Sequence, residues 1–299
     1  MNKYFSIIII VTLGLCLLLL GGCSADQKPA VTGNKAAKTI IAVSIIPEQT
    51  FVEAVAGDMV EVVVMVPPGS NPENYSPTPQ EMAKLSDASL YFAIGVPAER
   101  ANILPSIKDL NSRIKVVDLP AAAAAVYPDR EFAPGERDPH IWLSPKRVRV
   151  IVDTIADELG QLDPVNAEYY LRNAQNYQKQ LEKLDTNIKS ALADLDQKTF
   201  IVYHPALGYF AEDYDLQMLA IEEEGKEATA KHIQEIIDQA KNDDIQVVFY
   251  QASVSSKQAA AIAQDIGGYT EKIDPLAADY TGNLQKIADT FARVLQQKR

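Results

Sequence analysis

Residues 138–145 read Asp138-Pro139-His140-Ile141-Trp142-Leu143-Ser144-Pro145, and they hold one of the three histidines and the single tryptophan of the chain. Each proline ring fixes its own φ and restricts the residue before it, so His140 has a defined backbone pose. Such a segment suits a side chain that must point at a ligand. Taken alone, it is explained more simply by a surface histidine and a core tryptophan, and only other proline-framed segments favour a binding role.

The residues that follow this segment predict two helices. The first covers 145–159, and the second is one long helix over 164–195. Apolar side chains recur along the second at spacings of three and four. They are Tyr177, Leu181, Leu184, Ile188, Leu192 and Leu195. About 30 residues at 1.5 Å each span about 45 Å, which is longer than one small lobe. We therefore expect this helix to run across two lobes; a coiled-coil seam is the alternative, but the stripe is short and rich in tyrosine.

Strands alternate with helices on both sides of the long helix. Expected strands cover 39–44, 60–66, 90–94, 115–118, 199–203, 216–221 and 246–250, and a last short strand ends within 272–276. Expected shorter helices cover 51–56, 79–85, 229–241, 257–266 and 283–296. Continuous apolar strands that alternate with helices predict parallel sheets. The predicted fold is α/β, with two α/β lobes at 39–160 and 197–299 joined by one long interdomain helix within 161–196. Residues 121–137 are expected to form a loop.

The N-terminus has the features of an export signal. Lys3 precedes an uncharged apolar run over 7–20 that is short for a membrane span, and small residues follow it. The sequence Leu20-Gly21-Gly22-Cys23 resembles a bacterial lipobox, in which the cysteine becomes the lipidated first residue; an ordinary cysteine after an ordinary signal is the alternative. We expect a signal peptide at 1–22, a flexible tether at 23–38, and an exported protein that is anchored outside the bacterial membrane or periplasmic.

Charge and cysteine content exclude several partners and sites. The formal net charge of −12 argues against a nucleic-acid partner. Cys16 lies inside the predicted signal, so the mature chain would keep only Cys23. A disulfide framework and a thiolate zinc site are therefore excluded, and any metal must be held by nitrogen and oxygen.

Four possible metal ligands lie near prolines where expected strands or loops end. Glu73 lies in the proline-rich loop 67–79, His140 in the opening segment, His204 directly after one strand, and Asp274 at the end of another. Ligands of parallel α/β sheets bind at the carboxyl ends of the strands, so we expect these four in the cleft between the lobes. Two imidazoles and two carboxylates suit Zn²⁺ or Mn²⁺. A site filled by four protein ligands favours capture over catalysis, because catalytic zinc keeps an open position.

Each of these residues also has a simpler explanation. Glu73 alone is a loop carboxylate, Asp274 alone could cap the turn before Pro275, and His204 alone could be a satisfied histidine at a strand end. His232, the remaining histidine, is expected on a solvated helix face and not as a ligand.

Four segments follow one another along the chain: PPGSNPENYSPTP, DPHIWLSP, YHPALGYF and IDPLAADY. In this order they resemble segments of the metal-binding lipoproteins of bacterial zinc and manganese ABC importers, the cluster A-I solute-binding proteins. PPGSNPENYSPTP is similar to the family's PPG-x-x-PH-x-YEPTP, and DPHIWLSP to its DPH-x-WLDP. YHPALGYF resembles YH-x-A-x-x-YF, and IDPLAADY resembles the carboxylate-bearing DPL segment. The resemblance covers nearly the whole mature chain and implies two α/β lobes, a long backbone helix, and the ligands Glu73, His140, His204 and Asp274.

The resemblance also implies a function and leaves the metal open. It implies a monomeric receptor, tethered through an N-terminal lipid, that passes a divalent ion to an ABC permease and its ATPase. Glu73 stands where the family has histidine, while His204 keeps the zinc-type residue in the third segment; we expect zinc first and manganese second. The glutamates of the turn 222–227 are expected to be solvated, although the family often has a glutamate near the cleft there.

Two alternatives stay open at this point. A metal-dependent hydrolase would need an open metal position and a general base, and no His-Glu-x-x-His segment occurs in the chain. A surface adhesin or interaction module would need an exposed binding patch, which the sequence does not reveal. For the receptor we expect weaker metal binding below about pH 6, because histidine binds metal when neutral. We also expect little hinge closure across the long helix.

Overall fold

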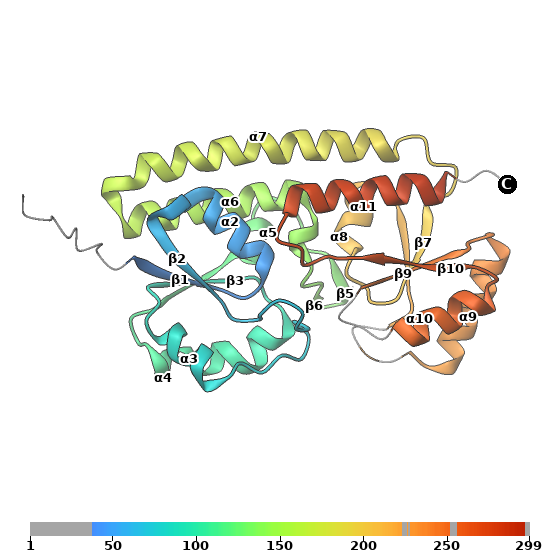
Figure 1. Ribbon diagram of the computed structural model, residues 1–299, viewed down its shortest axis with the longest axis horizontal. Helices are drawn as coiled ribbons and strands as arrows, with labels where there is room; N and C mark the ends of the chain where they lie inside the picture. Colours follow the sequence, from blue (N-terminus) through green and yellow to red (C-terminus); the bar gives the residue numbers. More distant parts are fainter. Residues whose placement is uncertain (1–37, 223–225, 227, 252–255, 297–299) are drawn as a thin grey trace, which may run out of the picture. The chain divides into compact units, whose positions relative to one another are not determined.

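Two parallel β-sheets organise the part of the chain that the computed structural model describes, residues 38–222, 226, 228–251 and 256–296 (Figure 1). The first sheet has strand order β2-β1-β3-β4 and the second β10-β9-β7-β8, and every pairing within these two sheets is parallel. Their bounds are β1 Thr39–Val43, β2 Val60–Val64, β3 Leu90–Ala93, β4 Lys115–Asp118, β7 Thr199–Val202, β8 Gln217–Ala220, β9 Val247–Gln251 and β10 Tyr269–Ile273. The predicted fold of two α/β lobes with parallel sheets is confirmed.

Helices make the crossovers between the strands and cover both sheets (Figure 1). In the first lobe these are α2 Ile46–Ala56, α3 Pro79–Ser86, α4 Leu104–Leu110, α5 Leu119–Ala124 and α6 Pro145–Leu162. In the second lobe they are α8 Gly208–Asp213, α9 Ala230–Asn242, α10 Ser256–Asp265 and α11 Tyr280–Leu295. Short turns of helix complete the described set: η1 Gly57–Met59, the π-helical η2 Glu99–Ile103, η3 Ile141–Leu143 and η4 Pro164–Asn166.

The long helix is α7, Ala167–Leu192, whose 26 residues span about 39 Å. It packs against α2 and α6 in the first lobe and against α11 in the second (Figure 1). All six side chains of the predicted stripe, 177, 181, 184, 188, 192 and 195, are buried. The stripe therefore faces helices of both lobes and does not form a coiled-coil seam.

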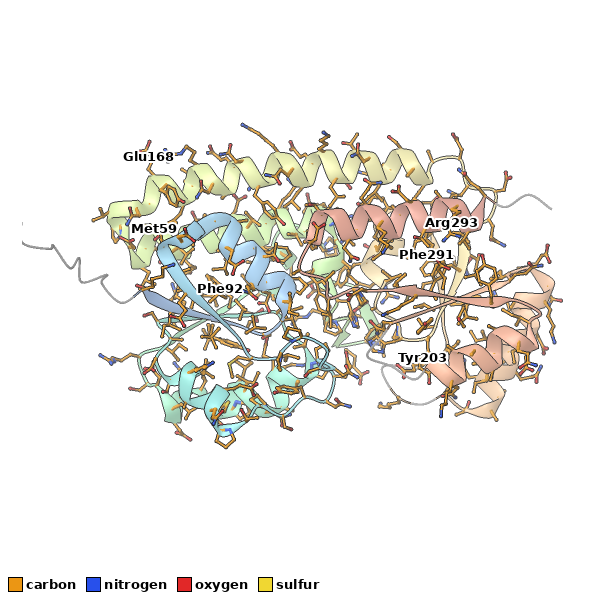
Figure 2. All side chains as sticks on the ribbon, viewed as in Figure 1. Met59, Phe92, Glu168, Tyr203, Phe291 and Arg293 are labelled. Carbon is orange, nitrogen blue, oxygen red and sulfur yellow. The ribbon has the colours of Figure 1, made fainter. Side chains whose placement is uncertain are left out.

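One continuous apolar core lies beneath α7 and includes buried side chains from both lobes. Phe92 points into the first lobe and Phe291 into the second, whereas Met59 and Glu168 lie at the surface (Figure 2). Phe291 packs against Phe200 and Phe249, with ring centroids 4.7 and 4.4 Å away. A shared core opposes large rotation of one lobe against the other, because rotation would expose apolar surface to water.

Residues 121–137 do not form the loop that the sequence predicts. The alanine run continues α5, whose first turn is capped by the Asp118 carboxylate accepting from the Ala121 amide at 3.0 Å. A short hairpin follows, β5 Glu131–Ala133 and β6 Glu136–Arg137, with Gly135 at φ +82° in its turn. Alanine has the highest helix propensity, and a carboxylate cap is sufficient to start one turn.

The predicted signal peptide 1–22, the lipidation site Cys23 and nearly all of the tether 23–38 lie outside the described residues. Among those that the structure describes, no helix is both long enough and apolar enough to cross a membrane. Helix α6 continues to Leu162 and α7 begins at Ala167. The division into lobes at 160 and 196 stays a prediction.

Candidate metal centre

The segment 138–145 is held in place by contacts with the second lobe. Trp142 is buried, and its indole N–H donates to the backbone carbonyl of Pro275 at 2.9 Å. The Tyr280 hydroxyl in turn donates to the carbonyl of Trp142 at 2.7 Å. Trp142 is thus a core residue whose polar atoms dock one lobe on the other, and this docking fixes the backbone that carries His140.

Three of the four predicted ligands converge on one point. Glu73 comes from the loop after β2, His140 from the turn before η3, and His204 from the turn after β7. Glu73 Oε1 lies 3.7 Å from His140 Nε2 and 3.6 Å from His204 Nε2, and the two Nε2 atoms are 3.2 Å apart. The site lies at the carboxyl ends of β2 and β7, where parallel α/β sheets bind ligands.

A carboxylate lies behind each histidine. His140 Nδ1 donates to Asp138 Oδ1 at 2.7 Å, and His204 Nδ1 donates to Glu222 Oε2 at 2.7 Å. Asp138 is fully buried, and its other oxygen accepts from Arg130 Nη1 at 2.7 Å. A carboxylate can only accept, so in each neutral ring the proton sits on Nδ1 and the Nε2 lone pair is free. When both rings are neutral, both lone pairs can bind a metal ion.

The spacing of the three donor atoms fits a transition-metal ion. Donors at 2.0–2.1 Å from a tetrahedral zinc ion lie about 3.3–3.4 Å from one another. The distances here are 3.2, 3.6 and 3.7 Å, so an ion about 2 Å from all three fits between them with little movement. Two imidazole nitrogens and one carboxylate oxygen form a donor set that zinc commonly uses.

The metal-free site holds a proton where the ion would bind. Burial by itself lowers the pKa of His204, but hydrogen bonds and charge interactions with Glu222 and Glu73 raise the pKa to about 9. Burial raises the pKa of Glu73, but its interactions with His204 and His140 outweigh burial and lower the pKa. At neutral pH, the Glu73 carboxylate therefore faces a His204 imidazolium, and a metal ion must displace the proton of that ring.

A cavity of about 310 Å³ opens on all three donor residues. The hairpin β5–β6 lines it through Phe132, Glu136 and Arg137, and η2 contributes Arg100. The three donors are one fewer than the four ligands that zinc usually has, and a further ligand could reach the ion from this cavity.

The structure does not bring Asp274 into this group. The group of possible ligands found among the described residues contains Glu73, His140 and His204. Asp274 is exposed, and its Oδ1 accepts from the Leu276 amide at 3.0 Å, as a residue that caps the turn around Pro275. Its role as a fourth ligand stays a prediction that this geometry does not support.

The sequence-based interpretation was wrong for Glu222. This side chain is only 11% exposed and bonds His204 directly, so it does not belong to a solvated turn. The family that the sequence resembles often has a glutamate near the cleft in this segment. That resemblance could have identified Glu222 as a partner of His204. Residues 223–225 and 227 lie outside the described residues. His232 is half-buried and its Nε2 lies 3.0 Å from the Ala220 carbonyl, so it is less solvated than expected, and it lies outside the group of possible ligands.

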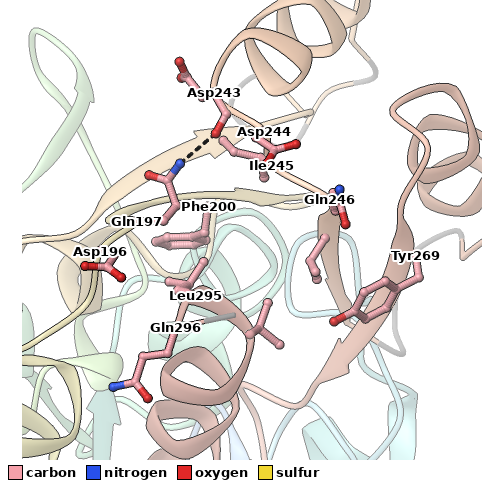
Figure 3. Close-up of a pocket in the computed structure, with 12 residues that line it drawn as sticks. Asp196, Gln197, Phe200, Asp243, Asp244, Ile245, Gln246, Tyr269, Leu295 and Gln296 are labelled. Carbon is pink, nitrogen blue, oxygen red and sulfur yellow. Dashed lines mark hydrogen bonds between the residues drawn. The ribbon is translucent and has the colours of Figure 1, made fainter. Parts of the chain in front are cut away.

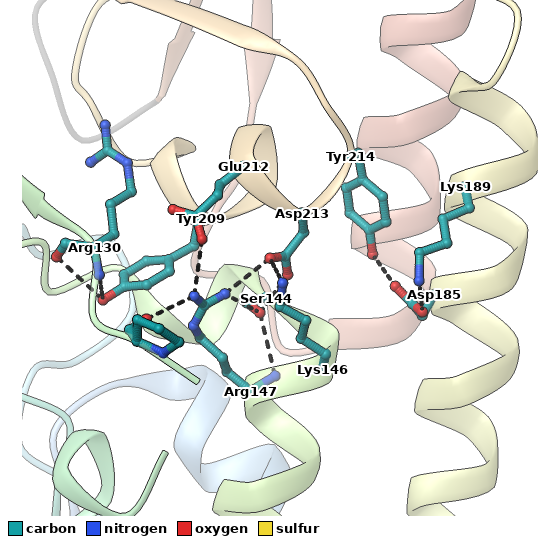
Figure 4. A network of polar contacts seen from close by, with 11 residues as sticks. Arg130, Ser144, Lys146, Arg147, Asp185, Lys189, Tyr209, Glu212, Asp213 and Tyr214 are labelled. Carbon is teal, nitrogen blue, oxygen red and sulfur yellow. Dashed lines mark hydrogen bonds and ion pairs between the residues drawn. The ribbon is translucent and has the colours of Figure 1, made fainter. Parts of the chain in front are cut away.

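A buried polar network joins the end of the segment 138–145 and the start of α6 to α8 (Figure 4). Arg147, at the start of α6, donates to Asp213 on α8 at 2.9 Å and to the Pro128 carbonyl at 2.9 Å. Ser144 donates to the same carboxylate at 2.6 Å, and the Arg147 guanidinium lies 4.6 Å from the centre of the Tyr209 ring. Because α8 follows His204 closely and α6 follows His140 closely, this network fixes the two histidine-bearing turns relative to each other.

A cavity of about 590 Å³ lies elsewhere in the second lobe, lined by residues such as Asp196, Asp243 and Tyr269 (Figure 3). It lies beside the amino ends of β7, β9 and β10, the opposite edge of the sheet from His204. Its position is unlike that of ligand sites in parallel sheets, and it takes no part in the metal centre.

Known proteins resemble this chain over most of its length. The family model described as "Zinc-uptake complex component A periplasmic" matches residues 41–294. The high-affinity zinc uptake system protein ZnuA of Bacillus subtilis is 26% identical over 273 residues, covering 87% of this chain and 86% of the relative. The manganese-binding lipoprotein MntA of Halalkalibacterium halodurans is 28% identical over 310 residues, covering 98% of each chain.

Solved structures agree with the fold. A crystal structure of ZnuA is 40% identical with a TM-score of 0.81, covering 86% of this chain and 99% of that one. A zinc-bound deletion mutant of ZnuA is 39% identical with a TM-score of 0.82, covering 88% of this chain and all of the other. The similarity therefore includes both lobes and the long helix.

Proposed function

Because the chain belongs to the zinc-uptake complex component A family, we propose that it is the extracytoplasmic receptor of an ABC importer for a divalent transition metal. It captures the ion between Glu73, His140 and His204 and delivers it to a membrane permease. The observation that carries this proposal is the convergence of three donor atoms within 3.7 Å, with a carboxylate behind each histidine. Components of uptake systems are not enzymes, and the hydrolase alternative is excluded on that ground.

Zinc is the proposed cargo and manganese the second choice. Relatives named for both metals occur, the zinc uptake protein of Bacillus subtilis and the manganese-binding lipoprotein of Halalkalibacterium halodurans. Manganese prefers six ligands, most of them oxygen atoms. The site offers three donor residues, and two of them bind through nitrogen. The Irving–Williams order also places zinc above manganese for a given site.

The finer parts of the proposal concern membrane attachment and partners. We propose that Cys23 carries the lipid that anchors the protein outside the membrane, and that a monomer meets a permease driven by its ATPase. The sequence Leu20-Gly21-Gly22-Cys23 supports the lipid, and the relatives named as lipoproteins agree with it. Mass spectrometry of the membrane fraction tests the anchor: a diacylated cysteine at the N-terminus is expected, and an unmodified chain would contradict it.

Calorimetric titration tests the main proposal. The metal-free protein is titrated with Zn²⁺ and with Mn²⁺ at fixed pH and ionic strength. We expect one saturable site for zinc and a weaker one for manganese, with zinc displacing manganese. Absence of saturable binding of either ion would refute the proposal.

The adhesin alternative draws its support from one kind of structural neighbour. A mutant of the laminin-binding adhesin of Streptococcus agalactiae is 26% identical with a TM-score of 0.75, covering 85% of this chain and 98% of that one. A pull-down on laminin tests this alternative, and absence of binding would exclude it for laminin.

A further inference from the structure

Arginine side chains line the cavity beside the metal centre. This is unexpected in a receptor for a cation, because their positive charge repels the metal ion. The cavity of about 310 Å³ that opens on Glu73, His140 and His204 is also lined by Arg100, Arg137 and Lys226. Positive charges at the mouth of a site lower the local concentration of a dication. Glu136 also lines the cavity and offsets part of this charge. Glu136 can offset only one of the two arginine charges, and the other arginine charge calls for an anion.

The two guanidinium groups are free to receive an anion. Within the described residues, the side chains of Arg100 and Arg137 make no hydrogen bond or ion pair. Arg137 is half-buried, and its guanidinium lies so close to Gly95, at φ +87°, that an added Cβ there would be 2.5 Å from Nη2. Gly95 thus leaves the space in which the guanidinium lies. A partly desolvated guanidinium without a partner is costly, and the planar fork fits a carboxylate.

The metal centre supplies a second attachment point for such an anion. Three protein donors leave a four-coordinate ion one ligand short, and the cavity opens on all three donor residues. Glu73 is the single carboxylate among the three donors, so it offsets only half of the charge of a dication. A cavity of 310 Å³ has the volume of about ten waters at 30 Å³ each, which is room for a small organic acid.

We propose that the loaded receptor binds a small polycarboxylate together with the metal ion. One carboxylate of the anion fills the fourth position on the ion, and another pairs with Arg100 and Arg137. The anion neutralises the bound dication and the two guanidinium groups at once. This inference rests on the proposed function, because the ion must be present to hold the first carboxylate.

Binding of malonate to the zinc-loaded protein tests the inference. The wild-type protein is loaded with one equivalent of Zn²⁺ in chloride buffer, freed of excess metal, and titrated with malonate. We expect the zinc-loaded protein to bind malonate saturably at a ratio of 1:1. The metal-free protein should bind malonate at least tenfold more weakly. Acetate has one carboxylate and should bind at least tenfold more weakly than malonate. A parallel titration with phosphate tests whether the site prefers an inorganic oxyanion.

Variants separate the anion site from the metal site. The double variant Arg100→Gln/Arg137→Gln should lose at least tenfold in malonate affinity while its zinc affinity in chloride stays within threefold or rises. Arg113→Gln, an exposed arginine before β4, is the charge-matched control and should bind malonate as the wild type does. The inference is overturned if zinc-loaded wild type binds no malonate, if the double variant binds it equally well, or if phosphate binds more tightly. Failure of the wild type to bind zinc at all would instead refute the proposed function.

Discussion

The Nε2 atoms of His140 and His204 lie 3.2 Å apart, although 64 residues separate them in the chain. The Nδ1 atoms point the other way, each to its own carboxylate, Asp138 or Glu222. Two ring nitrogens this close need either a shared proton or a shared metal ion between them. The metal-free site therefore stores a proton in the position that the ion occupies, and proton and metal compete.

The first prediction concerns the pH dependence of metal binding. The pKa of His204 is about 9, because the carboxylates of Glu222 and Glu73 outweigh the effect of burial. Below that pH the ring is protonated in the metal-free protein, so binding must release the proton and affinity should fall by up to tenfold per pH unit. The fall thus begins near pH 9, and not near pH 6 as an ordinary histidine would suggest.

Calorimetry in buffers of different ionisation enthalpy measures this proton directly. At pH 7.5 we expect release of close to one proton for each zinc ion bound. An affinity that is constant between pH 7 and pH 9, with no proton released, would contradict the competition.

The second prediction concerns the carboxylate behind His204. Glu222→Gln keeps a hydrogen-bond acceptor for Nδ1 but removes the charge, and Glu222→Ala removes both. Loss of such a partner typically costs 10–100-fold in metal affinity. We expect Glu222→Ala to fall in that range and Glu222→Gln to lose less, with fewer protons released because the pKa of His204 drops. Glu235→Gln, an exposed glutamate of α9, is the control and should change neither quantity.

The third prediction distinguishes the ligands. Glu73→Ala removes one of three converging donors and should lower zinc affinity at least 100-fold. Asp274→Ala removes an exposed carboxylate that bonds its own turn, so we expect zinc affinity within threefold of the wild type. A large loss in Asp274→Ala would show that the turn moves on binding and that Asp274 supplies the fourth ligand. Calorimetry with zinc measures both variants.

The fourth prediction concerns the buried ion network of Arg147 and Asp213, whose side chains are 2% and 1% exposed. In Asp213→Ala, the Arg147 guanidinium loses its buried partner and keeps the exposed Glu212 carboxylate, 3.2 Å away. Removing one partner of a buried pair typically costs about 3–5 kcal/mol. We expect Asp213→Ala to lower the free energy of unfolding by that amount in urea titrations. Glu182→Gln, which breaks the exposed pair with Arg149, should cost less than about 1 kcal/mol. Equal effects of the two changes would contradict the structural role of the network.

The fifth prediction concerns Glu48, which is fully buried in the first lobe. Burial and the nearby charge of Glu99 raise the pKa of Glu48 well above its ordinary value, although the amides of Ser44 and Ile45 donate to it. The folded state therefore binds a proton that the unfolded state releases above its ordinary pKa. Stability should fall as the pH rises through the range between the two pKa values.

Glu48→Gln tests this dependence, because the amide oxygen can still accept from both backbone amides. We expect a higher melting temperature than the wild type at pH 8 and a smaller difference at pH 5. Glu53→Gln, at an exposed position on the same helix α2, should leave the wild-type pH profile unchanged. A Glu48→Gln profile parallel to that of the wild type would refute the raised pKa.

The sequence by itself determined the architecture of the described chain. Short apolar runs rich in β-branched residues, such as those of β1 and β9, favour buried strands, and they alternate with helical stretches. Apolar residues at spacings of three and four on α7 predicted which face of the long helix is buried. This spacing can be read from the sequence without knowledge of the tertiary structure. Helix α5 was missed although the sequence holds two start signals for it, the Asp118 cap and Pro120 in the first turn.

The sequence also identified Glu73, His140 and His204 as possible metal ligands. These residues lie in proline-containing segments that resemble the ligand-bearing segments of the metal-binding family. Only the tertiary structure decided which donors meet. Asp274 follows the edge strand β10 and Glu222 follows β8, the neighbour of the strand that leads to His204. Strand order therefore places Glu222 against the ring and leaves Asp274 to cap its own turn. Spacing along the chain cannot reveal this, because the order of strands in a parallel sheet is set by how the helices pack across it.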